Sequence, residues 1–325
     1  MNDIYLKLKR PLVLIGIGGA GSKVAVESSK SIDCECILIS NDKKDLNLNY
    51  RSIFIDSEPW INPTCHKLRS FAQFSSNEIR SELQKFQTLI VISNLAGNAG
   101  TAITPVVEKL ARQHSPTTTI ISFVIMPFKF EKERIFQSGI SLKRIRDFSD
   151  AVIVMDNDAL LDNYPDLSPE ECFEITNVAM RDVIDSISKG FILPDMNLLY
   201  ISKNYNDSAE LSINDSIGML YHNTDPELVN RALLYVMGGK RVPNQTLNLI
   251  VQILSKIFKN EGTATIAMTM CDSNKIGIHM MAAIDGKTRF DKYDPLSDII
   301  PERNFLDWED MDTSPDIEMR INNVE

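Results

Sequence analysis

The 325-residue chain lacks any apolar run of the roughly 18 residues that a membrane-spanning helix needs. Its longest apolar stretch, residues 118–126, has only the length of a strand. The first ten residues are charged and contain no apolar core, so they do not resemble a signal peptide. The sequence therefore predicts a cytoplasmic protein with no segment inserted into a membrane.

Basic residues and cysteines are also scarce. The chain has 34 Lys and Arg against 44 Asp and Glu, a formal net charge of −10, which argues against binding to nucleic acid or to anionic membrane. The five cysteines are scattered and odd in number, which favours reduced thiols over a disulfide framework. Cys34 with Cys36 and Cys65 with His66 form only isolated pairs of metal-ligating side chains, so no metal site is expected.

What the chain does have is an ordinary globular composition, 43% hydrophobic and 24% charged, over a length that suggests two domains. Apolar runs alternate with amphipathic stretches over residues 1–167, which predicts an α/β domain with a Rossmann-like parallel sheet between helices. The expected strands are Leu12–Ile17, Cys36–Ser40, Ser52–Ile55, Thr88–Ser93, Thr118–Met126 and Ala151–Met155. Helices are expected over Ser76–Phe86 and Thr104–His114, with Pro105 in the first turn of the second.

A long helix is predicted to connect this domain to the rest, over residues 168–190. Ser168 would cap it, Pro169 would occupy its first position, and Glu171 would complete a capping box. Residues 191–286 predict a second, smaller mixed α/β domain. Its expected strands are Leu198–Ser202, Ala232–Met237, Thr263–Met270 and Ile276–Ile284, with a helix over Gln245–Phe258.

The remaining residues, 287–325, are acidic and lose their periodicity. From Asn304 onward they include seven acids and one base, with Trp308, Ile317, Met319 and Ile321 among them. This composition is typical of a flexible tail, and its apolar residues leave open a short peptide that docks on another protein.

Two glycine-rich loops are the most informative feature, because each follows an apolar strand. The first, residues 16–21, reads GIGGAG, and the second, residues 96–102, reads AGNAGTA. A strand that ends in small residues and runs into a helix exposes backbone N–H groups at the positive end of that helix. Two such loops in one domain indicate a polyphosphate held from two sides.

The first loop alone supports a different interpretation. Gly16, Gly18 and Gly21 spell GxGxxG, and Asp42 follows Gly21 by 21 residues. That spacing is the dinucleotide fingerprint with its ribose-binding acid. An NAD-dependent enzyme is therefore an alternative, although it leaves the second loop and the long helix without a role.

Several further motifs together resemble the tubulin/FtsZ superfamily of filament-forming GTPases, nearer to FtsZ and the archaeal CetZ proteins than to tubulin. The similarity runs from Pro11 to Ile284. The first loop is similar to GVGGGGGN, with Ala20, Ser22 and Lys23 as its departures. Residues 89–107 align without gaps on the FtsZ strand, its GGGTGTG loop and the following AAPVV. Residues 127–131 read PFKFE, like the family's PFxFE, and Arg134 stands for the arginine that follows.

This resemblance implies a site for GTP or GDP and admits Mg²⁺ as a second cofactor. The residues that it assigns to the phosphates are Gly18, Gly19, Ala20, Gly21, Ser22, Lys23, Gly97, Asn98, Ala99, Gly100 and Thr101. It assigns Glu131 and Arg134 to ribose or phosphate, and Asn157, Phe173 and Asn177 to the base. Phe173 offers an apolar face, and the two amides offer the donor and the acceptor that guanine needs. Taken singly, Asn157 would equally suit a turn, Phe173 a hydrophobic core and Asn177 a solvated helix position.

In the same family an NxDxxD loop after the long helix reaches the nucleotide of the next subunit. Here Asp195 keeps the first acid and is the catalytic candidate, whereas Leu193 and Leu198 replace the asparagine and the second acid. Asn197 could position water but could not act as a base. The resemblance thus implies a cytoskeletal or cell-division protein that forms a head-to-tail homopolymer and hydrolyses GTP weakly. A non-hydrolysing regulatory partner of an FtsZ-like filament is the other alternative.

Overall fold

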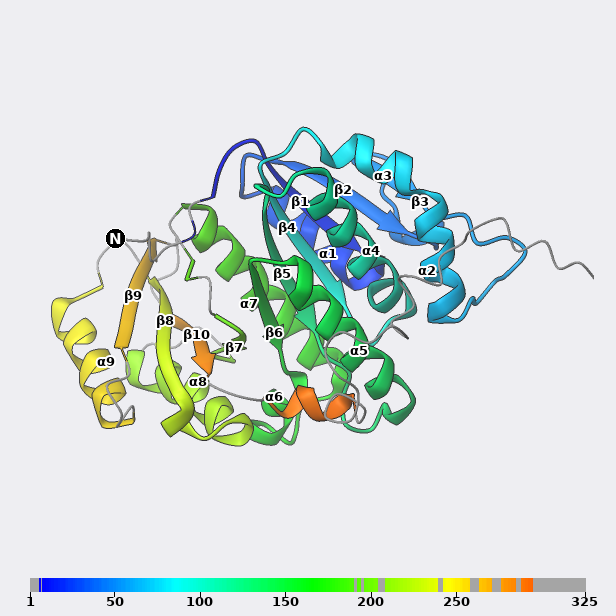
Figure 1. Cartoon of the computed structure of the whole chain (residues 1–325). Coiled ribbons are helices and arrows are strands. Elements are labelled where there is room, and N and C mark those ends of the chain that lie inside the picture. The colour runs from blue at the N-terminus through cyan, green and yellow to red at the C-terminus, as the bar shows by residue number, and fades with distance from the viewer. Residues whose placement is uncertain are drawn as a thin grey trace, which may run out of the picture.

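The computed structural model describes residues 6, 8–189, 192–193, 196–203, 208–238, 242–257, 263–270, 276–284 and 288–294. Within them, one sheet runs through the molecule in the order β3-β2-β1-β4-β5-β6-β7-β10-β8-β9 (Figure 1). The strands are β1 Leu12–Ile17, β2 Glu35–Ser40, β3 Arg51–Phe54, β4 Thr88–Asn94, β5 Thr119–Ile125, β6 Ala151–Met155, β7 Leu198–Tyr200, β8 Val229–Gly238, β9 Thr263–Met270 and β10 Gly277–Ile284.

Helices cover both faces of this sheet. In the described residues they are α1 Gly18–Ser29, α2 Cys65–Phe74, α3 Ser76–Leu83, α4 Asn98–His114, α5 Lys132–Phe148, α6 Asn157–Asn163, α7 Pro169–Lys189, α8 Ala209–Asn223 and α9 Asn244–Ile257, with short 3-10 turns η1 Lys43–Asp45, η2 Pro226–Leu228 and η3 Arg289–Tyr293. Alternate residues of β1 enter two separate cores: Leu12 and Leu14 face the core under α1 and α7, and Val13 and Ile15 face the core under α2, α3 and α4. Burial on both faces explains the nearly continuous apolar strands, and the predicted α/β class with a parallel sheet is confirmed.

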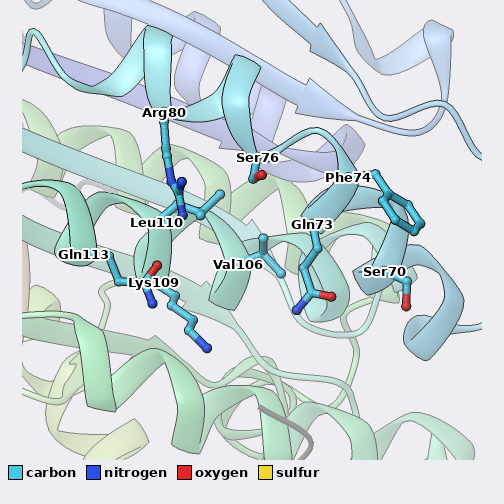
Figure 2. A pocket seen from close by; sticks show the side chains of 9 residues that line it. All are labelled: Ser70, Gln73, Phe74, Ser76, Arg80, Val106, Lys109, Leu110 and Gln113. Carbon is cyan, nitrogen blue, oxygen red and sulfur yellow. The ribbon is translucent and has the colours of Figure 1, made fainter. Parts of the chain in front are cut away.

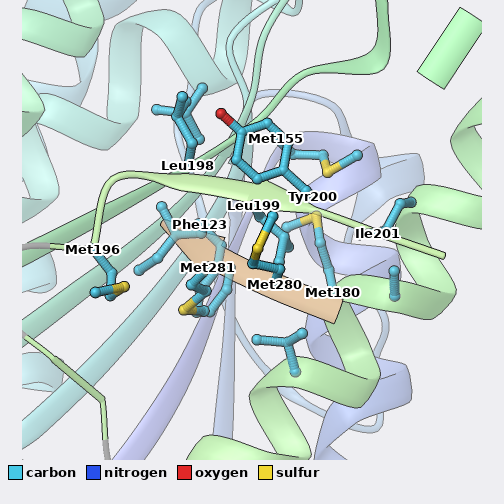
Figure 3. Packing of buried hydrophobic residues seen from close by; sticks show 14 of the residues in the cluster. Phe123, Met155, Met180, Met196, Leu198, Leu199, Tyr200, Ile201, Met280 and Met281 are labelled. Carbon is cyan, nitrogen blue, oxygen red and sulfur yellow. The ribbon is translucent and has the colours of Figure 1, made fainter. Parts of the chain in front are cut away.

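The second module continues the sheet of the first. β7 pairs in parallel with β6 through Val154 and Leu198, and β10 then runs antiparallel to β7 and β8. Methionines and aromatics fill the junction, where Met155, Met180, Tyr200 and Met281 pack together (Figure 3). The described strands of both modules therefore share one sheet, and the core under α1 and α7 continues from one module into the other.

The boundaries of α4 differ from the prediction. The helix begins at Asn98, six residues before the predicted Thr104, so Pro105 lies in its interior and not in its first turn. Proline cannot donate to the carbonyl four residues earlier, which is that of Thr101. The hydroxyl of Ser141 on α5 donates to this carbonyl instead, at 2.9 Å. A neighbouring helix thus compensates for the proline, and no local sequence signal shows that.

The capping box predicted for α7 is confirmed. Glu171 Oε2 accepts from the backbone N–H of Ser168 at 2.8 Å, and Ser168 Oγ accepts from the N–H of Glu171 at 3.2 Å. The sequence did not predict α2, α5, α6 or α8. In the part of the chain described here, no helix is both long enough and apolar enough to cross a membrane.

Glu108 is fully buried on α4 and gives the first testable prediction. Its two carboxylate oxygens accept from Ser122 Oγ at 2.6 Å and Ser149 Oγ at 3.0 Å, and burial raises its pKa from 4.5 to about 8. A raised folded pKa means that Glu108 contributes stability below pH 4.5, which is lost as the pH rises through about 8.

Glu108→Gln should therefore remove part of the fall in unfolding free energy between these two pH values. Urea denaturation at several pH values measures it, with the exposed Glu78→Gln on α3 as the matched control. Identical pH profiles for wild type and Glu108→Gln would show that Glu108 is ionised in the folded protein.

Candidate nucleotide site

The first glycine loop joins β1 to α1 through a sharp backbone turn. Gly18 has a φ of 67°, a conformation that favours glycine. A Cβ on Gly21 would lie 2.2 Å from the carbonyl oxygen of Ile92, so α1 approaches β4 more closely than any side chain allows. The hydroxyl of Ser22 donates inward to the carbonyl of Gly16 at 3.5 Å. The loop is thus held in shape from inside, and Gly19 and Ala20 remain at its outer side.

The second loop joins β4 to α4 in a similar way. Asn94 shapes it, because its Oδ1 accepts from the N–H of Ala96 at 2.8 Å. A Cβ on Gly100 would lie 2.1 Å from the carbonyl oxygen of Asn94. Thr101 is buried, and its Oγ1 lies 2.7 Å from the carbonyl oxygen of Leu95 and 2.9 Å from that of Gly97. Its hydroxyl therefore holds the loop and is directed inward.

The fold brings the two loops together. A Cβ on Gly18 would lie 3.1 Å from the Cβ of Ala99, so the starts of α1 and α4 touch. The residues at the N-cap positions, Ile17 and Gly97, are both described, and neither offers a side chain to the first-turn N–H groups. Two uncapped helix N-termini that converge form an anion site with many backbone donors.

Glu131 and Arg134 lie beside the second loop. Arg134 Nη1 donates to the carbonyl of Ala96 inside that loop, and Arg134 Nε lies 3.7 Å from Glu131 Oε1. Glu131 Oε2 accepts from the N–H of Phe128 at 3.0 Å. The half-exposed guanidinium is therefore placed at the edge of the anion site with a carboxylate next to it.

Asn157 lies at the carboxyl end of β6, where α6 begins, and α7 packs against it. Its Oδ1 accepts from Thr176 Oγ1 at 2.7 Å, which leaves its Nδ2 buried without a partner among the described residues. Asn177, one position further along α7, is 8% exposed, and its Oδ1 is likewise buried and unpaired. A buried donor and a buried acceptor without partners mark a place where a ligand or water completes the hydrogen bonding.

Phe173 lies one turn before Asn177 on α7. It is half-buried and meets the ring of Phe128 edge to face, with 5.3 Å between the ring centroids. Phe128 in turn stacks on Phe130 at 4.9 Å. The PFKFE segment that carries Glu131 therefore also supports Phe173.

The remaining predicted residues of the first loop and its neighbours have other contacts. Lys23 is exposed on α1 and lines an open hollow with Gly19, Lys44 and Asp45. Asn98 is tied to the segment before α2, because its Nδ2 donates to the carbonyl of Pro63 at 3.2 Å. The carboxylate of Asp42 caps η1 by accepting from the N–H of Lys44 at 2.9 Å. The acid required by a dinucleotide fingerprint is thus engaged in a turn.

The predicted catalytic residue, Asp195, lies outside the described residues, but its surroundings are informative. Leu193 and Leu198, the two apolar replacements in this loop, are only 2% and 1% exposed. Asn197 uses its amide on β10: its Nδ2 donates to the carbonyl of Ile284 and its Oδ1 accepts from the N–H of Ile284, each at 3.3 Å. Position 198 therefore belongs to the core and not to a surface loop.

Sequence reasoning missed Arg289, which comes from η3, after the last strand. Its guanidinium, 19% exposed, donates to Asp156 and lies 3.2 Å from Asp158 Oδ2, so it clamps the turn that carries Asn157. Burial raises the pKa of Asp158, and Arg289 opposes that shift. Arg289 follows Asp156 by 133 positions and belongs to no motif, so only the fold could reveal this contact.

With this geometry in place, comparison with known proteins is informative. Residues 11–165 match the family model described as Tubulin/FtsZ family, GTPase domain. Cell division protein FtsZ 2 of Methanocaldococcus jannaschii is 24% identical over 202 residues, which cover 57% of this chain and 50% of the relative. FtsZ 1 of Halobacterium salinarum is 30% identical over 199 residues, covering 56% and 48%. The chain thus spans about half the length of these relatives.

Solved structures agree on the fold. An FtsZ dimer of M. jannaschii gives a TM-score of 0.74 at 18% identity, covering 89% of this chain and 92% of that one. CetZ of Methanosaeta thermophila gives 0.70 at 13% identity, covering 89% and 90%. CetZ2 of Haloferax volcanii, in a GTPγS-bound protofilament, gives 0.63 at 17% identity, covering 89% and 98%. At these identities the comparison shows only that the fold is shared. The shared fold extends through both modules.

Proposed function

We propose that the chain, whose residues 11–165 match the tubulin/FtsZ GTPase-domain family, binds a guanine nucleotide across its two glycine loops and the α6–α7 edge. One observation carries the proposal most directly: Asn157 Nδ2 and Asn177 Oδ1 are buried without partners. Guanine presents an acceptor at O6 and donors at N1 and N2, so a base placed here would satisfy both amides. Adenine offers the opposite pattern at that edge and would leave them unpaired.

The phosphates would lie at the starts of α1 and α4. Backbone N–H groups from Gly19 to Lys23 and from Asn98 to Thr101 would donate to their oxygens. Arg134 would add a cation at the edge of the site, and Glu131 would hold that cation or the ribose. Mg²⁺, if it takes part, would be held mainly by phosphate oxygens and water, as is usual for this ion.

Thermal unfolding tests the proposed base recognition. A ligand that binds only the folded state stabilises it by about 2.7 kcal/mol at 100 times its Kd. GTP or GDP should therefore raise the Tm, whereas ATP and NAD at the same concentration should leave it unchanged. A shift with NAD alone would favour the dinucleotide enzyme, although the engagement of Asp42 with η1 argues against it.

We further propose that the protein self-associates head to tail as a cytoskeletal or cell-division factor. The supporting observations are the family match over residues 11–165 and the relatives whose structures are a dimer and a protofilament. Asp195 is the proposed acid at the subunit junction, and hydrolysis should be slow because Leu198 is buried in the core. Electron microscopy with GTP, GDP and no nucleotide separates a filament former from a regulatory partner, which would bind nucleotide without assembling.

Lys23 gives a second prediction, which concerns the first phosphate loop. The side chain is exposed beside Gly19, so we expect it to contribute a screened attraction to the phosphates. Lys23→Ala should weaken GTP binding several-fold at low salt, and the difference should shrink at high salt. Lys256→Ala, at an exposed position on α9 in the second module, is the matched control and should change nothing. Equal Kd values for wild type and Lys23→Ala at low salt would mean that the ammonium group points away.

A further inference from the structure

A small cavity of about 40 Å³ lies where α2, α4 and α5 meet. Three cations from three different helices line it: Arg69 from α2, Lys109 from α4 and Arg144 from α5. Its other walls are Gln73, Pro105, Val106 and Phe148. Three basic side chains thus line one cavity in a protein whose overall charge is −10.

Arg69 is poorly satisfied in this position. Its Nε and Nη2 are buried and have no hydrogen-bond partner in the part of the chain that the structure describes. Burial, and then the positive charge of Arg144, lower the pKa of Arg69 from 12.5 to about 10. A buried guanidinium next to a second one destabilises the fold unless an anion joins them. The arrangement is thus suited to receive a carboxylate.

The cavity continues into a larger hollow of about 340 Å³ between α2, α3 and α4 (Figure 2). The two share Gln73, Val106 and Lys109, and the larger one adds Arg80 together with the apolar side chains of Phe74 and Leu110. Phe74 is 76% exposed, an unusual state for an aromatic side chain. Together they form a groove, called here the α2–α4 groove, that offers cations beside apolar surface.

The described chain ends against α5, on the face of that helix opposite Arg144, because side chains two positions apart on a helix point in opposite directions. Arg146 Nη1 on α5 pairs with Asp291 Oδ1 of η3 at 2.6 Å. A Cβ on Gly139 would lie 2.8 Å from Tyr293, so η3 lies tightly against α5. The chain therefore leaves its last described residue, Asp294, beside the helix that carries Arg144. The nine residues before Asn304 can extend about 30 Å, three times the diameter of a helix.

We propose that residues 304–325 of the same chain dock in the α2–α4 groove, with carboxylates on Arg69 and Arg144. This segment has seven acids and one base, and its aromatic and aliphatic side chains, Phe305, Leu306 and Trp308, match the apolar surface at Phe74 and Leu110. A short tether raises the effective concentration of the segment to the millimolar range, which favours the chain's own tail over that of a second copy. The groove and its occupant do not depend on the proposed nucleotide.

Fluorescence of Trp308 tests this in the full chain. Trp60 and Trp308 are the only tryptophans, so Trp60→Phe leaves one reporter in the tail. We expect Trp308 to emit at shorter wavelength than a free peptide and to be quenched several-fold more slowly by acrylamide. Arg69→Ala with Arg144→Ala should abolish this protection, and so should high salt. Arg51→Ala, an exposed arginine on β3, is the matched control and should preserve it.

A tail variant keeps the test independent of any effect on folding. Asp307→Asn, Glu309→Gln and Asp310→Asn together change only the tail, and they should expose Trp308 as fully as the two arginine substitutions do. The proposal is overturned if Trp308 is equally accessible in the parent and in both variants. It is also overturned if protection rises with protein concentration, which would mean that the groove takes the tail of another copy or another protein.

Discussion

Leu198→Asp should destabilise the protein strongly and should not restore fast GTP hydrolysis. The resemblance to the NxDxxD loop makes this substitution look like the repair of a missing catalytic acid. However, Leu198 is 1% exposed in β7, paired with Val154 on one side and Ala282 on the other (Figure 3). A carboxylate there loses its hydration and gains no partner, so we expect a loss of at least ~3 kcal/mol in unfolding free energy at neutral pH.

Leu198→Asn is the matched control, because it has the same shape without the charge. Burial should raise the pKa of the new acid in the folded state above its unfolded value of about 3.9. Its ionisation therefore costs stability as the pH rises above about 4, so the two variants should be similarly stable in acid and diverge towards pH 7. Urea denaturation of both variants measures this. A stable Leu198→Asp protein with faster, concentration-dependent phosphate release would show that position 198 faces the subunit junction.

Asn177→Leu should weaken GTP binding by about 1–3 kcal/mol, roughly five- to 150-fold, without lowering stability. The substitution removes the buried, unpaired Oδ1 and keeps a similar volume, so the free protein loses no hydrogen bond through that atom. The nucleotide would lose the acceptor for its N1 and N2 protons. A loss of affinity combined with unchanged or increased unfolding free energy is the result that a ligand-binding role predicts.

Asn177→Asp is its matched control. It keeps an acceptor at the same place, so GTP binding should persist, whereas the Leu variant loses it. Fluorescence titration with a labelled guanine nucleotide compares the three proteins directly. If Asn177→Leu binds GTP as tightly as wild type, Asn177 has no contact with the base. Equal losses in both variants would indicate a structural role for the amide donor.

The sequence predicts the framework of the fold well because the relevant signals are local. The apolar strands β1, β4 and β6 are buried on both faces, and the capping box of α7 involves residues only three positions apart. The start of α4 was predicted too late because Pro105 was expected in the first turn. The carbonyl of Thr101, which Pro105 leaves without a donor, accepts instead from Ser141 on another helix. A rule about prolines in isolated helices cannot include that contact.

In the candidate site, too, features set by short motifs could be predicted, whereas features set by long-range contacts could not. Both glycine loops follow from short motifs, and the fold brings them together at Gly18 and Ala99. Arg289 could not be predicted, because it reaches Asp156 only after the chain has completed the second module. Alignment on the family loop suggested a surface role for position 198, whereas the pairing of β7 between β6 and β10 buries it.

Guanine recognition is the central claim, and calorimetric titration of the full chain with GTP, ATP and NAD tests it most directly. The unpaired amide atoms of Asn157 and Asn177 predict one GTP per chain, with ATP and NAD bound at least tenfold more weakly or not at all. In the same titration, Asn177→Leu should bind GTP more weakly than wild type does, with no change in its binding of ATP or NAD. Tight NAD binding without a GTP signal, or equal affinity for GTP and ATP, would contradict the account.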